Sequence, residues 1–319
     1  MKKCWKELVL AVVLAWGMPW VVMAAAEVAF ADEPTQPVMQ TQPPQTEPVS
    51  APAQIIPVWS DGVLRQMELT DYLTGVLISE MPGSFHAEAK KAQAIVARTY
   101  TLRRIDGSDK HPGAVCTDSR CCQGYLDPDT FADQETVRLA HSAVEATENL
   151  VLTYGGELID ATYFSCSGGM TEDAVAVWGS DVPYLQSVQS PGEEIAAHYT
   201  DTVSFSKAKI EAALGISLKG SSGNWIGTVI YTEGGGVASM VIGGKTFRGT
   251  ELRSALGLRS TAFEAKAENG GITFTTKGYG HRVGMSQYGA QAMALSGSNY
   301  GQILAHYYTG TALQEWMDR

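Results

Sequence analysis

The sequence predicts an α+β fold, with mixed helices and antiparallel strands around a substrate cleft. Helix-like and strand-like segments follow one another without the regular strand–helix–strand order of a parallel sheet. Segments with apolar residues at three- and four-residue spacing are interspersed with short, glycine-bounded segments of alternating polarity. The composition is that of a globular protein, with 45% hydrophobic and 18% charged residues among 319. A formal net charge of −11, without a basic stripe, argues against a nucleic-acid partner.

Residues 1–31 are expected to be a membrane segment. Three lysines among the first six residues precede a run that is apolar from residue 8 to residue 30, apart from Glu27. A run of this length can cross a bilayer. The alternative is a cleaved signal peptide with Ala29-Phe30-Ala31 as the cleavage site. We favour a single-pass anchor that holds the domain at the cell membrane on the extracytoplasmic side; cleavage would release an exported protein.

Residues 32–56 are predicted to be a linker. They are rich in Pro, Gln and Thr and contain almost no large apolar residues. Such a segment is semi-extended, at about 3 Å per residue. It would hold the folded domain, residues 57–319, away from the membrane.

The folded domain is expected to begin with a strand or hairpin over 57–70 and a helix over 71–80. Pro82 disfavours helical backbone at Met81, so this helix ends near Glu80. A second helix is predicted to start near Ser84, as its N-cap, and to end at Arg103-Arg104.

The later elements follow from the same patterns. Alternating polarity around Gly155-Gly156 predicts a hairpin over 149–162, and further strands are predicted in a β-meander over 225–248 and at 271–277. Helices are predicted over 133–147, 206–214, 250–256, 287–295 and 300–308. No internal repeat is visible.

Glu80 is the candidate catalytic residue. At a corner between two helices, its carboxyl group can project into a cleft. The unfavourable dipole at a helix C-terminus tends to raise the pKa of such a carboxyl group, which suits a general acid. The alternative is a solvated surface glutamate. Two polar loops, at 162–172 and 278–291, favour the cleft.

A cluster of His111, Cys116, Cys121 and Cys122 lies within twelve residues. Four such donors on one loop can form a tetrahedral zinc site, which would be closed and therefore structural rather than catalytic. A disulfide between Cys116 and Cys122, or unpaired thiols, are the alternatives. A zinc hydrolase would need an open coordination position, which four ligands do not leave. No organic cofactor is expected.

The two polar loops offer hydrogen-bonding groups for a polar ligand such as a sugar. Small hydroxylated residues and a glycine pair in 162–172 allow close approach of a ligand. The loop 278–291 adds His281, Gln287 and Tyr288. Cys166 is expected to be a buried or cleft-lining thiol; a nucleophilic role would require His281 as its base.

Four motifs, in this order, resemble those of the stage II sporulation protein D family, which also includes the amidase-enhancer proteins. They are SEMP at 79–82, KAQAIVARTY at 91–100, SCSGGMTE at 165–172 and GHRVGMSQYGA at 280–290. The resemblance covers the chain from about Leu64 to Leu313. Arg282 stands where a glycine is usual in the family's GHGVGMSQ pattern.

The resemblance implies a membrane-anchored lytic transglycosylase that cleaves peptidoglycan during engulfment in sporulation. Family members cut MurNAc–GlcNAc linkages and leave 1,6-anhydro-MurNAc ends. Their substrates are glycan strands from which a partner amidase or endopeptidase has removed the stem peptides, and other engulfment proteins are expected partners. The family's catalytic glutamate corresponds to Glu80. Its zinc loop is similar to His111, Cys116 and Cys122, with Cys121 where a histidine is expected.

Motif membership also supplies candidate substrate-binding residues. They are Gln93, Arg98, Tyr100, Ser165, Ser167, His281, Gln287 and Tyr288. Ordinary glycosidases pair two carboxyl groups, for which Glu88 is a weaker second candidate, whereas a lytic transglycosylase needs one. The alternative function is a non-catalytic wall-binding protein that activates an amidase, which would not need Glu80.

Overall fold

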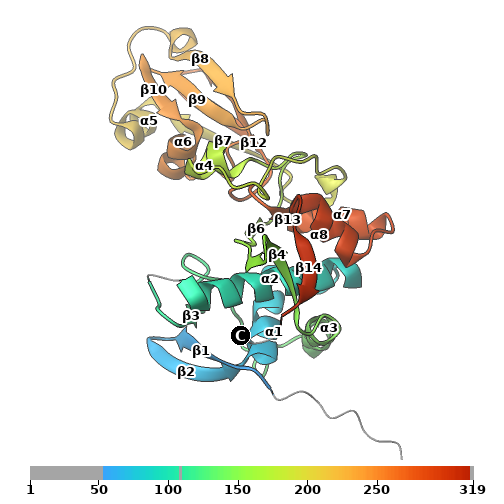
Figure 1. Cartoon of the computed structure of the whole chain (residues 1–319). Helices are drawn as coiled ribbons and strands as arrows, with labels where there is room; N and C mark the ends of the chain where they lie inside the picture. Colours follow the sequence, from blue (N-terminus) through green and yellow to red (C-terminus); the bar gives the residue numbers. More distant parts are fainter. Residues whose placement is uncertain (1–52, 108–109, 317–319) are drawn as a thin grey trace, which may run out of the picture. The chain divides into compact units, whose positions relative to one another are not determined.

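The structure is a computed structural model that describes residues 53–107 and 110–316. The predicted membrane segment, residues 1–31, lies outside these residues, as does the predicted linker up to residue 52. Among the described residues, no helix combines the length and the apolar character needed to span a membrane. The fold is α+β, as predicted, and is built from several small, mostly antiparallel sheets (Figure 1).

The two helices predicted around Glu80 are both present, and the break between them is where Pro82 places it. Helix α1 spans Leu69–Glu80 and is followed by Met81 in an extended conformation. Helix α2 spans Ala87–Gly107 and therefore starts two residues later than a helix with Ser84 as its N-cap would. The Phe85 amide donates to the Pro82 carbonyl at 3.0 Å, so residues 82–85 form a turn and Ser84 is not the N-cap.

Helix α2 is the central helix of the larger body, residues 55–189 and 281–316 (Figure 1). It packs against α1, α3, α7 and α8, and two apolar clusters of buried side chains lie along it. The other helices of this body are α3 (Gln134–Glu145), α4 (Ala174–Trp178), α7 (Gln287–Leu295) and α8 (Tyr300–Tyr307). Its strands are β1 (Ile55–Ser60), β2 (Val63–Glu68), β3 (Val115–Cys116), β4 (Leu150–Tyr154), β5 (Glu157–Leu158), β6 (Tyr163–Phe164), β13 (Met285–Ser286) and β14 (Ala312–Glu315).

Three small sheets frame these helices. Strands β2, β1 and β3 form one sheet, and β14, β4 and β5 form another. The parallel pair of β6 and β13 joins the two polar loops, because Met285 lies opposite Tyr163 and Ser286 opposite Phe164. The motifs at 165–172 and 280–290 are therefore neighbours in space.

A third apolar cluster forms the core of a second lobe, residues 200–277. Strands β10 (Lys245–Arg248), β9 (Val237–Ile242) and β8 (Ile226–Tyr231) form the predicted meander. A second sheet contains β11 (Phe263–Glu268), β12 (Gly271–Lys277) and β7 (Thr200–Ser206), of which only β12 was predicted. The lobe also holds α5 (Lys207–Leu214), α6 (Gly249–Leu256) and a 3-10 turn at Ser222–Asn224; a second 3-10 turn, at Glu193–Ile195, precedes the lobe.

Candidate active site

Glu80, the last residue of α1, lies beside the cysteine-containing loop. Its Oε1 atom accepts a hydrogen bond from the Gly124 amide at 2.9 Å. A side chain at position 124 would not fit, since a Cβ atom there would lie 2.6 Å from Ser79 Oγ and 2.9 Å from Glu80 Oε1. Glycine at this position therefore lets the loop backbone reach the carboxyl group.

The environment of Glu80 favours its protonated form. Burial raises the pKa of the carboxyl group above its ordinary value, while hydrogen bonding from Gly124 and the nearby Gln287 and Tyr163 side chains opposes the rise. The Gln287 side chain lies near the carboxyl group but does not form a well-formed hydrogen bond with it. Its Nε2 atom has no hydrogen-bond partner among the described residues. The raised pKa agrees with the expectation from sequence, but burial is its main cause.

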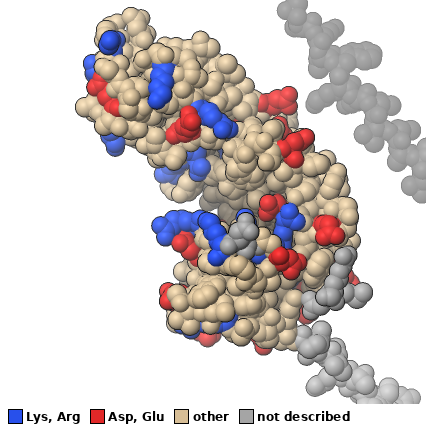
Figure 2. All heavy atoms as spheres, turned by 60° about the vertical axis from the view of Figure 1, so that its left-hand side comes forward, with Lys and Arg blue, Asp and Glu red and all other residues tan. Residues whose placement is uncertain are grey.

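A cavity of about 490 Å³ opens in front of Glu80. Both polar loops and the cysteine-containing loop contribute to its walls, which include Tyr100, Arg104, Arg120, Tyr163, Ser165, Trp178, Tyr279 and His281. Of the described residues that line it, Glu80 alone carries a carboxyl group. One face of the molecule, shown in Figure 2, is hollowed, and both acidic and basic side chains surround this hollow.

His281 supports the cavity wall as a neutral side chain. Its Nδ1 atom accepts the Val283 amide at 3.2 Å, so the proton lies on Nε2, which donates to the Tyr163 carbonyl at 3.0 Å. Burial lowers the pKa of His281 to about 4. Both ring nitrogens are occupied, and the Cys166 thiol instead contacts Glu193 at 3.5 Å. The structure does not bring Cys166 and His281 together as a nucleophile and its base.

Two exposed aromatic residues at the cavity were missed from the sequence. Trp178 and Tyr279 are both 48% exposed. The Trp178 ring lies 5.4 Å from the His281 ring, and the Arg259 guanidinium lies 5.5 Å from the Tyr279 ring. Trp178 ends the short helix α4, where no local pattern distinguishes a ligand-binding aromatic residue from a core residue. Only the tertiary structure places Trp178 at the cavity, whereas Tyr279 belongs to the loop 278–291 that the sequence already assigned to the cleft.

Four of the eight predicted substrate-binding residues lie at or next to the cavity. Tyr100, Ser165 and His281 line it, and Gln287 adjoins Glu80. Tyr288 instead packs edge-on against Phe85, with ring centroids 5.1 Å apart.

The other three are buried away from the cavity. Arg98 donates to the carbonyls of Val144 and Thr147 and so holds the end of α3. Gln93 is completely buried in α2. The Ser167 hydroxyl donates to Glu193 at 2.7 Å. The contacts of Arg98 and Ser167 stabilise the scaffold around the cavity, whereas neither polar side-chain atom of Gln93 has a hydrogen-bond partner among the described residues.

Glu193 is a buried carboxylate that organises both polar loops. It is completely buried yet accepts hydrogen bonds from several donors at once. The donors are the amides of Ser167, Gly168 and Gly169 and the hydroxyls of Ser167, Ser190 and Ser286. Because Ser286 also caps α7, one side chain fixes the loop 165–169 relative to the helix that carries Gln287. This role could not be predicted from the sequence, since the segment around Glu193 has no motif.

The cysteine cluster forms as predicted. The donor atoms of His111, Cys116, Cys121 and Cys122 all lie within 4.8 Å of one another, and Cys121 Sγ is 3.5 Å from His111 Nε2. The three cysteines are free thiols, so the alternative disulfide is not formed. Three sulfur donors and one imidazole could hold a metal such as zinc. Cys121 and Cys122 also line the Glu80 cavity, so a metal here would brace the loop that carries Gly124.

Comparison with known proteins agrees with the motifs. A family profile described as Stage II sporulation protein (SpoIID) matches residues 60–154. Stage II sporulation protein D of Bacillus subtilis strain 168 is 39% identical over 272 residues, which cover 82% of this chain and 79% of that protein. The same identity is found to stage II sporulation protein D of Bacillus amyloliquefaciens. The amidase enhancer of Bacillus subtilis strain 168 is 30% identical over 297 residues, covering 76% of this chain and 40% of that protein. The chain therefore belongs to the SpoIID family of sporulation proteins.

Proposed function

We propose that this protein is a peptidoglycan lytic transglycosylase with Glu80 as its single acid and base. The observation that carries the proposal is the lone carboxyl group in the cavity, buried enough to raise its pKa. Hydrolysis of a glycosidic bond ordinarily uses two carboxyl groups, one as acid and one as base or nucleophile. Glu88, the second candidate from the sequence, instead pairs with Lys91 at 2.8 Å and accepts the Tyr300 amide.

The reaction proceeds in two proton transfers. The Glu80 carboxyl group donates its proton to the oxygen that bridges MurNAc and GlcNAc, and the bond from that oxygen to C1 of MurNAc breaks. The C6 hydroxyl oxygen of the same MurNAc then bonds to C1, and the Glu80 carboxylate takes the hydroxyl proton. The products are a 1,6-anhydro-MurNAc end and a free GlcNAc end. No water is consumed, and Glu80 returns to its protonated state.

Other groups of the chain hold the substrate and the acid in place. The Gly124 amide orients the Glu80 carboxyl group, and Trp178 and Tyr279 offer flat apolar faces for sugar rings. The His281 ring donates a hydrogen bond to the Tyr163 carbonyl and so holds together the part of the cavity wall that these two residues form. We propose that His111, Cys116, Cys121 and Cys122 hold a structural zinc ion, which would stiffen the loop around Gly124.

The proposed setting is the outer face of the cell membrane during engulfment. Residues 1–31 would anchor the chain, and a partner amidase or endopeptidase would strip the stem peptides before cleavage. The similarity to an amidase enhancer supports a second candidate, a wall-binding protein that activates an amidase.

Mass spectrometry of the products tests the proposal. The full-length protein, purified in mild detergent, would be incubated with peptide-stripped glycan strands. We expect anhydro-ended fragments, which are lighter by one water than hydrolysis products. Fragments with an added water would mean hydrolysis, and intact strands bound by the protein would favour the amidase-activating role.

A further inference from the structure

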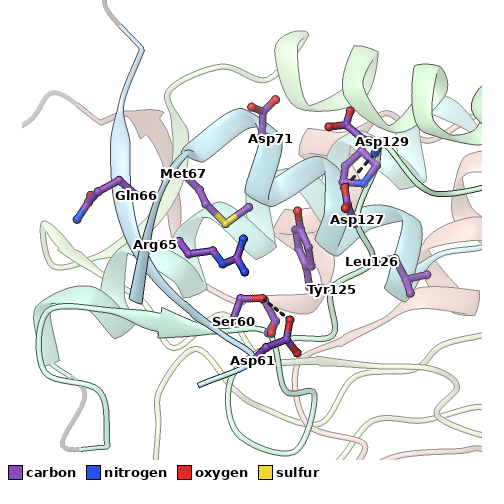
Figure 3. Close-up of a pocket in the computed structure, with 12 residues that line it drawn as sticks. Ser60, Asp61, Arg65, Gln66, Met67, Asp71, Tyr125, Leu126, Asp127 and Asp129 are labelled. Carbon is purple, nitrogen blue, oxygen red and sulfur yellow. Dashed lines mark hydrogen bonds between the residues drawn. The ribbon is translucent and has the colours of Figure 1, made fainter. Parts of the chain in front are cut away.

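A second cavity, of about 670 Å³, is lined in part by residues of the cysteine-containing loop and of the segment that follows it. It is larger than the Glu80 cavity and shares no lining residue with it. Its walls come from the hairpin β1–β2, the first turn of α1, Thr117 within the cysteine-containing loop and residues 125–129 after it (Figure 3). The lining includes Ser60, Asp61, Arg65, Gln66, Met67, Asp71, Thr117, Tyr125, Leu126, Asp127 and Asp129.

Three of the four aspartates that line this cavity lie on a different wall from Arg65, whereas Asp61 lies in the turn of the hairpin that carries Arg65. Arg65 extends from β2 into the cavity, facing Tyr125, while Asp71, Asp127 and Asp129 lie around the far side of the Tyr125 ring (Figure 3). Burial, together with Asp127, Asp71 and Asp129, raises the pKa of Tyr125 to about 12, and Arg65 opposes this rise. Tyr125 therefore lies in the field of all four charged groups.

These charges do not neutralise one another directly. In the part of the chain that the structure describes, Arg65 forms no ion pair with any of the aspartates. A ligand can therefore offer an anion to Arg65 and a cation to the aspartates without breaking an ion pair between them. Charge-assisted hydrogen bonds of this kind are stronger than neutral ones.

The Tyr125 ring forms a rigid wall between the two charged regions. It stacks on Tyr72 with centroids 5.8 Å apart and an angle of 10° between the ring planes. A Cβ atom at Gly75 would lie 2.1 Å from Tyr125 Cε2, so only glycine allows the ring to lie against α1. An ordered aromatic face next to carboxylates is a favourable environment for an ammonium group.

We propose that this cavity binds an amino acid head group, an ammonium and a carboxylate on the same carbon atom. The carboxylate pairs with Arg65, the ammonium lies between the Tyr125 face and Asp71, Asp127 and Asp129, and Met67 contacts the aliphatic part. In a peptide, the N-terminal residue lacks the free carboxylate and the C-terminal residue lacks the free amine. Only a free amino acid, or the far end of a diamino acid side chain in a wall peptide, carries both. That this ligand comes from a cell-wall peptide rests on the function proposed above.

Three matched probes separate the contributions of the two charges. Norleucine carries both groups, hexanoate is the same chain without the amine, and pentylamine lacks the carboxylate. Calorimetric titration of the full-length protein should show norleucine binding at least about tenfold more tightly than either of the others. A tripeptide with a diamino acid side chain distinguishes the sources: binding as tight as norleucine indicates a wall peptide, and weaker binding indicates a free amino acid.

Substitutions of single residues then test which charged side chain binds which group of the ligand. The Arg65→Gln variant should bind norleucine no more tightly than pentylamine. The Asp71→Asn variant should bind both of these ligands more weakly than the parent does. Both residues are exposed, and thermal melting confirms folding. Arg138→Gln is the matched control, since Arg138 pairs with Glu135 on the exposed face of helix α3. Equal binding of norleucine and hexanoate, no change in Arg65→Gln, or loss of binding in Glu80→Gln would overturn the proposal. These binding results do not depend on glycan cleavage.

Discussion

Arg282 Nη1 lies 2.9 Å from Glu172 Oε1, in an ion pair whose two side chains are almost completely buried. The same guanidinium donates to the carbonyls of Ser167, Met170 and Gly234. Gly234 belongs to the turn between β8 and β9, so the arginine ties the loop 165–172 to the second lobe. Arg282 has φ of +69°, a left-handed conformation that glycine adopts more easily. Its side-chain contacts explain how an arginine is accommodated where the family pattern has glycine.

Arg282→Gly should destabilise the protein even though glycine adopts the left-handed backbone conformation at this position more easily. Removing one partner of a buried ion pair costs about 3–5 kcal/mol, while glycine at a left-handed position recovers about 1–2 kcal/mol. We expect a net loss of about 1–4 kcal/mol, measured by chemical denaturation. Arg138→Gln, which breaks an exposed pair, should change stability by less than about 1 kcal/mol. Equal effects of the two substitutions would contradict this account of Arg282.

Cleavage should depend on the protonated form of Glu80. Because the pKa of Glu80 is raised, its acid form persists above the range of an ordinary glutamate, and the rate should fall as pH rises through that raised pKa. The raised pKa of Glu80 also makes the stability of the folded protein depend on pH. Glu80 stabilises the folded state fully at pH values below the pKa that its carboxyl group has in the unfolded chain. This contribution is lost as the pH rises through the raised pKa of Glu80 in the folded protein. Glu80→Gln should therefore melt at a higher temperature than the parent at neutral pH, with the difference shrinking in acid.

Removal of the metal should loosen the loop that holds Gly124. Mass spectrometric metal analysis should find one zinc per chain, and a chelator or Cys116→Ser should remove it and lower the melting temperature. Glycan cleavage should fall in parallel, because the Gly124 amide orients Glu80. Cys166→Ser is the matched control: Cys166 is also a free thiol but lies outside the cluster. If metal content were unchanged in Cys116→Ser, the assignment of the site would be wrong.

Trp178 and Tyr279 should contribute to substrate binding more than to chemistry. Stacking of a ring on an aromatic face is worth about 0.5–1.5 kcal/mol, so alanine at either position should raise KM by up to about tenfold with a smaller change in kcat. Tyr231→Ala provides the control, since Tyr231 is similarly exposed, at 53%, but lies on β8 of the second lobe. A drop in kcat alone would mean that these rings do not act as a binding surface.

Local patterns predicted the elements around Glu80 well. Pro82 stops α1 where expected, and the cysteine spacing predicted a cluster that forms in space. Strands β7 and β11 were missed, although each alternates in burial, because strand pairing depends on distant partners such as β12.

The assignment of polar motif residues was less complete. Arg98 and Ser167 were predicted to contact substrate, but they bind backbone carbonyls and Glu193 in the interior. A motif shows that a side chain is needed without showing whether it faces ligand or scaffold. Trp178, Gly124 and Glu193 act through contacts with residues far along the chain, so no local pattern could reveal them.

The most direct test of the catalytic role of Glu80 compares Glu80→Gln with Glu88→Gln. Both remove one carboxyl group from neighbouring helices, but Glu88 pairs with Lys91 and lies outside the cavity. On peptide-stripped strands, the parent and Glu88→Gln should release anhydro-ended fragments at similar rates. Glu80→Gln should be slower by about 10²–10⁴-fold while still binding the strands. Cleavage by Glu80→Gln at the parental rate would contradict the account.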